Sequence, residues 1–163
     1  MNVSDRISHI TNWISNYAKS NSNETFELVV GVSGGIDSAV TSSLCAMTGI
    51  KTHVVSMPIK QNHNQHDLSL IHINWLKKKY NNIRTYIIEL DEVFKIFQKT
   101  MNEFDSELAF ANSRSRLRMV TLYQIAQNYK ALVVGTGNKV EDFGIGFFTK
   151  YGDGGVDISP IAD

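Results

Sequence analysis

Cysteine is nearly absent from the 163-residue sequence, which contains only Cys45. A single cysteine excludes an intrachain disulfide framework and is typical of a reducing compartment, so we expect a cytoplasmic protein. The sequence has no run of about 18 apolar residues, which a membrane-spanning helix would need. The first residues, MNVSDRISHI, lack the basic-then-apolar order of a signal peptide. We therefore expect no membrane partner.

Neither sign of charge is in excess, because 16 Lys and Arg residues balance 16 Asp and Glu residues. A balanced charge argues against a broad nucleic-acid footprint, so any anion site must be local. A length of 163 residues suits one domain with a buried core. We expect a single domain over residues 1–163 and no nucleic-acid partner.

The hydrophobic pattern predicts helices and strands in alternation. Apolar residues at helical spacing predict helices over residues 4–17, 37–49, 65–80, 91–101 and 105–129. Short apolar runs predict strands over residues 26–32, 51–57, 83–90 and 131–136. Four buried strands separated by helices favour an α/β fold, with a parallel sheet flanked by helices. The stretch 144–163 has five glycines and no helical period, which is typical of a functional or disordered segment.

The stretch 29-VVGVSGGIDSAV-40 places a glycine loop between a predicted strand and a predicted helix. A helix N-terminus offers free N–H groups to an anion, and glycines let a phosphate approach the backbone closely. The hydroxyls of Ser33 and Ser38 can add donors. The loop has no lysine and matches neither the mononucleotide nor the dinucleotide glycine motif. Charge neutralisation must therefore come from a metal or from basic residues elsewhere.

Asp37 is the one charged residue of this loop. A carboxylate beside bound phosphates repels them unless a cation lies between, and Mg²⁺ is held by one or two carboxylates plus phosphate oxygens. Asp37 could instead only cap its helix. The residues alone leave both roles open.

With S-G-G-I-D-S after an apolar strand, the sequence resembles the N-type ATP pyrophosphatases, the PP-loop superfamily. That resemblance implies a Rossmann-like fold of the adenine nucleotide alpha hydrolase type, and cleavage of ATP between its α and β phosphates. Three further segments resemble the ammonia-dependent NAD synthetases within this superfamily: 112-NSRSRLRM-119, 135-GTGNKVE-141 and 147-FFTKYGDGGVD-157. These segments and the loop follow one another in the same order as in that family, so the resemblance extends over essentially the whole chain.

The resemblance implies a ligase that forms a C–N bond. Its reaction is the ATP-dependent amidation of nicotinic acid adenine dinucleotide (deamido-NAD) by ammonia, through an acyl adenylate, to give NAD, AMP and pyrophosphate. It also implies Mg²⁺ as cofactor, a homodimer, and no nucleophile supplied by the protein. Since the synthetase domain begins almost at once, we expect free ammonia, and not a preceding glutaminase domain, as the nitrogen source.

The resemblance also implies three sets of site residues. Those for ATP are Gly31, Ser33, Gly34, Gly35, Ile36, Asp37, Ser38, Arg116 and Thr136. Those for the dinucleotide are Asn112, Arg116, Phe147, Lys150, Asp153 and Asp157. Those for magnesium are Asp37 and Glu141.

Plainer roles stand beside some of these assignments. Asn112 and Arg116 are four residues apart and share a helix face, whereas Arg118 points elsewhere and is expected to pair internally. The alternative for this segment is a solvated basic face built with Arg114. Thr136 could instead cap a helix, and the two acids of the 147–157 segment could instead form turns.

Other reactive side chains have no function assigned to them. His63, His66 and His72 lack the compact spacing of zinc ligands, so exposed histidines at a helix start are expected. Cys45 has no activating motif around it, and we expect it in the core.

One departure from the family concerns length. The NAD synthetases continue past the D-I-x-P-I segment, whereas this sequence stops at Asp163. We therefore expect a C-terminally incomplete domain. Two alternatives to the synthetase remain: a non-catalytic nucleotide-binding fragment, and another PP-loop enzyme such as a tRNA-modifying one, which the balanced charge and lone cysteine disfavour.

Overall fold

One parallel sheet organises the chain, for which a computed structural model describes residues 2–19, 26–60, 63–146 and 148–162. Its strands lie in the order β3-β2-β1-β4. Their bounds are Glu27–Gly31 for β1, Thr52–Ser56 for β2, Ile83–Ile87 for β3 and Ala131–Val134 for β4. The predicted α/β class with a parallel sheet is confirmed, and each strand lies inside its predicted range.

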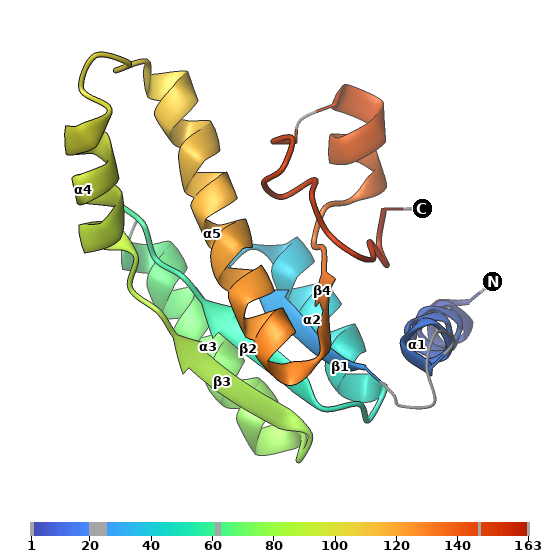
Figure 1. The fold of residues 1–163 in the computed structure, drawn as a ribbon. Coiled ribbons are helices and arrows are strands. Elements are labelled where there is room, and N and C mark those ends of the chain that lie inside the picture. Colours follow the sequence, from blue (N-terminus) through green and yellow to red (C-terminus); the bar gives the residue numbers. More distant parts are fainter. Residues whose placement is uncertain (1, 20–25, 61–62, 147, 163) are drawn as a thin grey trace.

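Helices cover both faces of this sheet (Figure 1). On one face lie α1 (Val3–Lys19), α2 (Ile36–Met47) and α3 (His63–Lys79). On the other lie α4 (Asp91–Thr100) and α5 (Glu107–Tyr129). The five helices fall on the five predicted helical ranges.

The side chains of each strand alternate between the two faces of the sheet and so divide the core into two layers. Leu28 and Val30 of β1 pack with α1, α2 and α3, whereas Val29 packs with α4 and α5. Successive side chains of a strand point to opposite faces of a sheet, so one apolar strand supplies both layers. Cys45 of α2 lies in the first layer as expected, and burial raises the pKa of its thiol to about 12.

The strand order reverses direction at β1. The chain runs outward from β1 to β2 and β3, then returns through α4 and α5 to place β4 on the other side of β1. In open α/β sheets, ligands bind beyond the carboxyl ends of the strands at such a switch point. The connections that follow β1 and β4 meet there.

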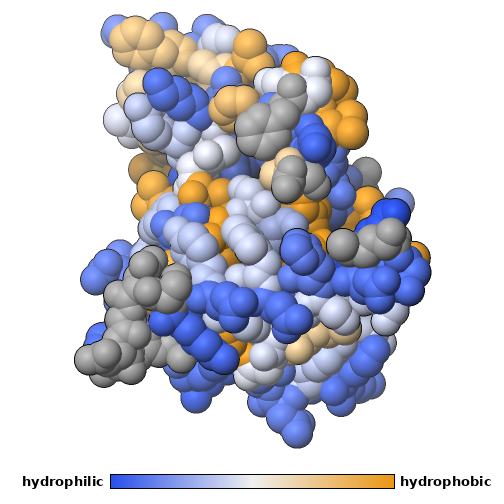
Figure 2. Space-filling model, turned by 90° about the vertical axis from the view of Figure 1, so that its right-hand side faces the viewer, coloured by the Kyte–Doolittle hydropathy of each residue, from blue (hydrophilic) through white to orange (hydrophobic). Residues whose placement is uncertain are grey.

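The segment after β4 is mostly irregular, as predicted, but contains one element that the sequence did not indicate. This is η1, a π-helix over Val140–Ile145. Further on, Ile158 bridges Val134 in parallel, so the last described residues run along β4. Figure 2 looks onto the side of the molecule that holds α1 and this segment; hydrophobic residues gather in its upper half, and the lower half is mostly hydrophilic. None of the described helices is long and apolar enough to span a membrane.

Candidate functional site

The glycine loop connects β1 to α2 and is closed by its own hydroxyls. The N–H of Ser33 donates to Ser38 Oγ at 3.2 Å, and Ser38 Oγ donates to the carbonyl of Gly35 at 2.9 Å. Gly34 has φ +89°, and a Cβ there would lie 2.2 Å from the carbonyl oxygen of Gln65. Since Gln65 belongs to α3, only glycine lets that helix approach the loop so closely.

Asp37 does not cap α2. The N-cap is Gly35, which makes no side-chain cap bond, and Asp37 lies inside the first turn. Its Oδ2 accepts a hydrogen bond from Asn138 Nδ2 at 3.2 Å. The capping alternative is therefore wrong, and the carboxylate faces the connection that follows β4.

Asn138 joins the two connections at the switch point. Besides its bond to Asp37, its Oδ1 accepts the backbone N–H groups of Val140 at 3.0 Å and Glu141 at 3.1 Å. This side chain therefore fixes the start of η1 against the glycine loop. Asn138 lies within the motif 135–141 but was not among the predicted site residues; a short polar side chain shortly after a predicted strand was the available signal.

Acidic side chains gather around this bridge. Burial, and then the charges of Asp153, Glu141 and Asp37, raise the pKa of Asp142. Neighbouring carboxylates that raise the pKa of an acid form a region of negative potential that a cation would relieve. In the part of the chain that the structure describes, no three His, Cys, Asp or Glu side chains are already arranged as metal ligands.

Helix α5 holds the segment that precedes Asp157. Ser115 Oγ donates to Asp153 Oδ1 at 3.0 Å and accepts the N–H of Asp153 at 2.9 Å. Thr149 Oγ1 donates to Asn112 Oδ1 at 3.0 Å, and Arg116 Nε donates to the carbonyl of Lys150 at 3.1 Å.

Four residues expected at the dinucleotide site are thus brought together: Asn112, Arg116, Lys150 and Asp153. The fifth, Phe147, lies outside the described residues. The sixth, Asp157, is directed elsewhere. Its Oδ2 accepts the N–H of Val133 at 2.8 Å and its Oδ1 the hydroxyl of Tyr123 at 3.1 Å, so it fastens the last segment to β4.

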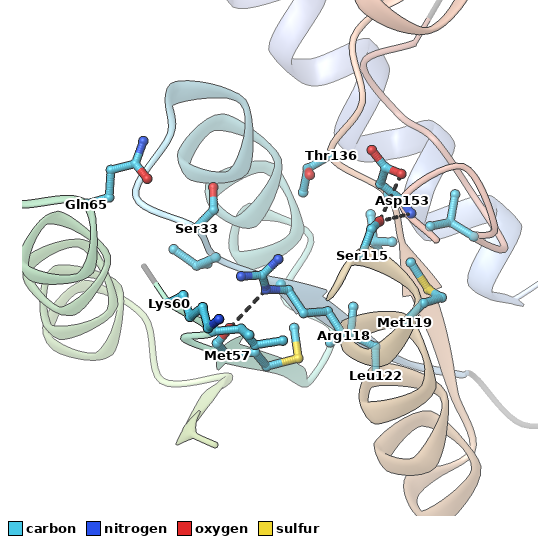
Figure 3. Close-up of a pocket in the computed structure, with 16 residues that line it drawn as sticks. Ser33, Met57, Lys60, Gln65, Ser115, Arg118, Met119, Leu122, Thr136 and Asp153 are labelled. Atoms are coloured by element: carbon cyan, nitrogen blue, oxygen red, sulfur yellow. Dashed lines mark hydrogen bonds between the residues drawn. The ribbon is translucent and has the colours of Figure 1, made fainter. Parts of the chain in front are cut away.

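A cavity of about 460 Å³ opens between the glycine loop, the end of β2 and α5 (Figure 3). Four of the expected site residues line it: Gly31, Ser33, Thr136 and Asp153. Its apolar wall comprises Val32, Met57, Ile59, Met119, Leu122, Val134 and Val156. Among the other expected residues, Gly34, Gly35, Ile36, Asp37, Ser38, Asn112, Arg116, Glu141, Lys150 and Asp157 do not line it.

Two basic side chains that were not predicted as site residues also line the cavity. Arg118 and Lys60 line it, whereas Arg116 does not. Arg118 Nε donates to the carbonyl of Met57 at 3.0 Å. The pKa of Arg118 is lowered by burial and then by Arg114, while Asp91 acts in the opposite direction. Internal pairing was expected for Arg118, and the bond to the Met57 carbonyl is such a contact, although no ion pair joins Arg118 to a carboxylate among the described residues. Helical periodicity alone could not say which α5 face meets the cavity.

The sheet, the glycine loop at its switch point and the adjoining cavity define the PP-loop class of Rossmann-like proteins. The sequence profile of the NAD synthase family matches residues 6–163, and the chain belongs to this family. The NH(3)-dependent NAD(+) synthetase of Mycoplasma genitalium is 36% identical over 164 residues, covering 99% of this chain and 63% of the relative. That of Saccharolobus solfataricus is 41% identical over 138 residues, covering 83% of this chain and 47% of the relative.

Solved structures give the same result. The NMN synthetase of Francisella tularensis superposes with a TM-score of 0.90 at 34% identity, covering all of this chain and 66% of that one. The NH3-dependent NAD synthetase of Campylobacter jejuni superposes with a TM-score of 0.87 at 30% identity, covering all of this chain and 68% of that one. The chain therefore spans roughly half to two thirds of the length of these relatives.

Proposed function

We propose that the chain catalyses the ATP-dependent amidation of deamido-NAD by ammonia, which is the reaction of an NH3-dependent NAD synthetase. The observation that supports this most directly is the position of the SGGIDS loop, in a chain of the NAD synthase family. The loop lies at the switch point of the sheet and its Ser33 opens onto the cavity.

The chemistry needs two transfers. A nicotinate carboxylate oxygen attacks the α-phosphorus of ATP, the bond to the bridging oxygen breaks, and pyrophosphate leaves. Ammonia then attacks the acyl carbon of the adenylate, AMP leaves with the former carboxylate oxygen, and the nitrogen loses a proton to form the amide. Neither transfer needs a nucleophile from the protein, whose contribution is positioning and charge stabilisation.

Each expected site residue takes a role in this proposal. The residues assigned to ATP are Gly31, Ser33, Gly34, Gly35, Ile36, Asp37, Ser38, Arg116 and Thr136. The backbone N–H groups of the loop would hold the pyrophosphate that leaves. The residues assigned to the dinucleotide are Asn112, Arg116, Phe147, Lys150, Asp153 and Asp157. The contacts among Asn112, Arg116, Lys150 and Asp153 support one shared binding surface.

Asp37 and Glu141 are the proposed magnesium ligands. The donor set fits, because Mg²⁺ binds one or two carboxylates and completes its shell with phosphate oxygens and water. Asn138 contacts the carboxylate of Asp37 and the backbone of Glu141. Burial, and then the charges of neighbouring acids that include both residues, raise the pKa of Asp142 beside them. When bound, Mg²⁺ would neutralise charge on the phosphate oxygens.

The test supplies the purified chain with ATP, Mg²⁺, ammonium and deamido-NAD, and separates the products by chromatography. NAD and AMP in equal amounts are expected. Asp37→Ala should reduce turnover at least about a hundredfold, the usual effect of losing one transition-state electrostatic contact. Asp105→Ala, in the α4–α5 connection, is the control and should leave turnover unchanged. Nucleotide binding without AMP release would support the non-catalytic alternative, and adenylation of a tRNA base the tRNA-modifying one.

A second candidate substrate is the mononucleotide. The high structural similarity to an NMN synthetase favours testing it, since amidation of nicotinic acid mononucleotide would give NMN by the same two transfers. The two acids are compared through kcat/KM with ammonia and ATP saturating. A higher kcat/KM for the mononucleotide would change the proposed substrate without changing the reaction.

The proposal also includes a homodimeric state and a cytoplasmic location. Exposed apolar side chains gather on the outer faces of α4 and α5 and on the segment after β4, and a second copy of the chain could cover them: Val93, Ile96, Phe97, Leu108, Val120, Tyr123 and Tyr151. Use of ATP and a single free, buried cysteine support the cytoplasm as the compartment.

A further inference from the structure

Arg118 brings into the cavity a charge that no ion pair balances among the described residues, although the more distant carboxylate of Asp91 acts on it electrostatically. The side chain is partly buried, and Figure 3 shows its guanidinium reaching across the cavity towards Lys60 and Ser33. Its hydrogen-bond partner among the described residues is the carbonyl of Met57, which accepts from Nε at 3.0 Å. No ion pair joins it to a carboxylate of the residues described in the structure. A partly desolvated guanidinium is costly unless an anion balances it, so its free Nη groups suit an anionic ligand.

Lys60 lies beside it in a strained backbone conformation. Its φ is +46°, in the left-handed region that a residue with a Cβ adopts at a cost of about 1 kcal/mol or more. Asp91 holds this turn, because its Oδ1 accepts the N–H of Lys60 at 2.7 Å. The ammonium lies 6.0 Å from the Phe94 ring centroid and forms no ion pair with the other described residues. Such strained positions cluster at ligand-binding sites.

The two sides of the cavity differ in charge. Lys60 and Arg118 come from the side formed by the end of β2 and by α5, and Arg114 lies close enough to lower the pKa of Arg118. Asp153 lines the other side, with Asp142 close enough for their charges to interact. An anion in the cavity is therefore drawn towards Lys60 and Arg118, away from the acids that are proposed to face magnesium.

We propose that Arg118 and Lys60 form a phosphate subsite of this cavity, across from the Ser33–Ser38 loop. The inference rests on the proposed function, because it assumes that the cavity receives a nucleotide. It also identifies the basic residues that a loop without lysine requires. Guanidinium nitrogens bind a phosphate through paired hydrogen bonds, and the flexible ammonium adds a point charge. The phosphate belongs either to ATP or to the nicotinic acid nucleotide.

Calorimetric titration of the full chain tests the subsite with three probes: ATP, adenosine and deamido-NAD. Arg118→Gln and Lys60→Met should each weaken the binding of the phosphate-bearing ligand about tenfold or more, as expected for the loss of one charge-assisted contact. Adenosine affinity should change less than about twofold, because it carries no phosphate. The salt dependence of the affinity should also fall. If only the affinity for ATP falls, the subsite binds the triphosphate. If only the affinity for deamido-NAD falls, the subsite binds the dinucleotide.

Matched controls separate charge from folding. Arg118→Lys keeps the charge and should recover part of the affinity, whereas Lys60→Gly should relieve the backbone strain and still lose affinity. Lys99→Met and Arg84→Gln remove exposed cations far from the cavity and should leave all affinities unchanged. Circular dichroism and thermal unfolding verify that each variant is folded.

The outcomes also separate the subsite from the proposed reaction. Equal ATP and deamido-NAD affinities in the wild type and both charge-removing variants would overturn the subsite, as would an equal loss for adenosine. A wild-type chain that binds ATP but forms no amide would overturn the reaction and leave the subsite intact. A wild-type chain that binds neither phosphate-bearing probe would overturn both.

Discussion

Gly34 illustrates how much depends on a single hydrogen atom in place of a side chain. Its φ of +89° is unfavourable for other residues, and a Cβ would lie 2.2 Å from the Gln65 carbonyl oxygen. We expect Gly34→Ala to displace the loop and weaken ATP binding at least about tenfold. Isothermal titration with ATP measures this.

Gly49 provides a matched control for that substitution. It also has a positive φ, +75°, but no atom lies within 4 Å of its Cβ position. Gly49→Ala should therefore lower the free energy of unfolding by about 1 kcal/mol through backbone strain alone, with no effect on ATP affinity. If both variants bind ATP as the wild type does, the close approach of α3 to the loop is not required for binding.

Tyr123 provides a pH-dependent signal from the contact that fastens the last segment to β4. Burial, and then the charge of Asp157, raise the pKa of Tyr123 to about 12. The unfolded chain releases this proton near pH 10, so the stabilisation is present below about pH 10 and is lost as the pH rises through about 12. The absorbance of tyrosinate should show Tyr123 titrating late, together with Tyr86, whose pKa is also raised by burial and then by Tyr129.

Replacing Asp157 separates the two causes. Asp157→Asn should lower the pKa of Tyr123, though not to its ordinary value, because burial remains the larger cause. Asp105→Asn, remote from Tyr123, should leave the titration unchanged. An unchanged late titration in Asp157→Asn would show that the carboxylate does not act on the phenol.

At the level of helices and loops, α5 orders the segment proposed to bind the dinucleotide. Ser115 makes two hydrogen bonds to Asp153, and a Cβ on Gly152 would lie 2.4 Å from Ser115 Oγ, so the two surfaces are closely packed. Ser115→Ala removes both bonds. We expect the amide of Asp153 to exchange with deuterium at least about tenfold faster, as expected for a lost bond of about 1.4 kcal/mol.

The neighbouring Ser113 supplies the comparison for that measurement. It lies on the same helix and makes no hydrogen bond to the described part of residues 148–157. Ser113→Ala should leave the exchange of Asp153 unchanged. Equal exchange in wild type and Ser115→Ala would mean that packing around Gly152, and not hydrogen bonding, orders the segment.

The sequence predicted these elements unevenly, for physical reasons. Strands and helices were recoverable because buried apolar residues repeat with the period of each element, and the glycine loop because its glycines stand between an apolar run and a helical pattern. The π-helix η1 could not be predicted, because no residue preference distinguishes it from an α-helix or a loop. Lys60 was missed because a lysine does not signal a left-handed turn, and Arg118 because periodicity separates it from Arg116 without orienting α5 over the cavity.

At the level of the chain as a whole, the proposed homodimer depends on the apolar outer face of α5. Met119, Val120, Tyr123 and Tyr151 line a shallow groove there with two glutamines, Gln124 and Gln127. The side chain of Val120 is 65% exposed. Burial of such a side chain against a second copy would stabilise the dimer by about 1.5 kcal/mol or more, and a buried unpaired carboxylate would reverse the gain. Val120→Glu should therefore shift the chain from dimer to monomer in sedimentation velocity at micromolar concentration.

Ile71 on α3 is the control for this substitution, because it too is 65% exposed but lies on the opposite face of the sheet. Ile71→Glu should leave the sedimentation coefficient of the dimer unchanged, while a general effect of added charge would alter both variants equally. A wild-type chain that sediments as a monomer at every concentration would contradict the dimer. Dissociation by Ile71→Glu alone would instead move the interface to α2 and α3, away from the side of the sheet where α5 meets the cavity.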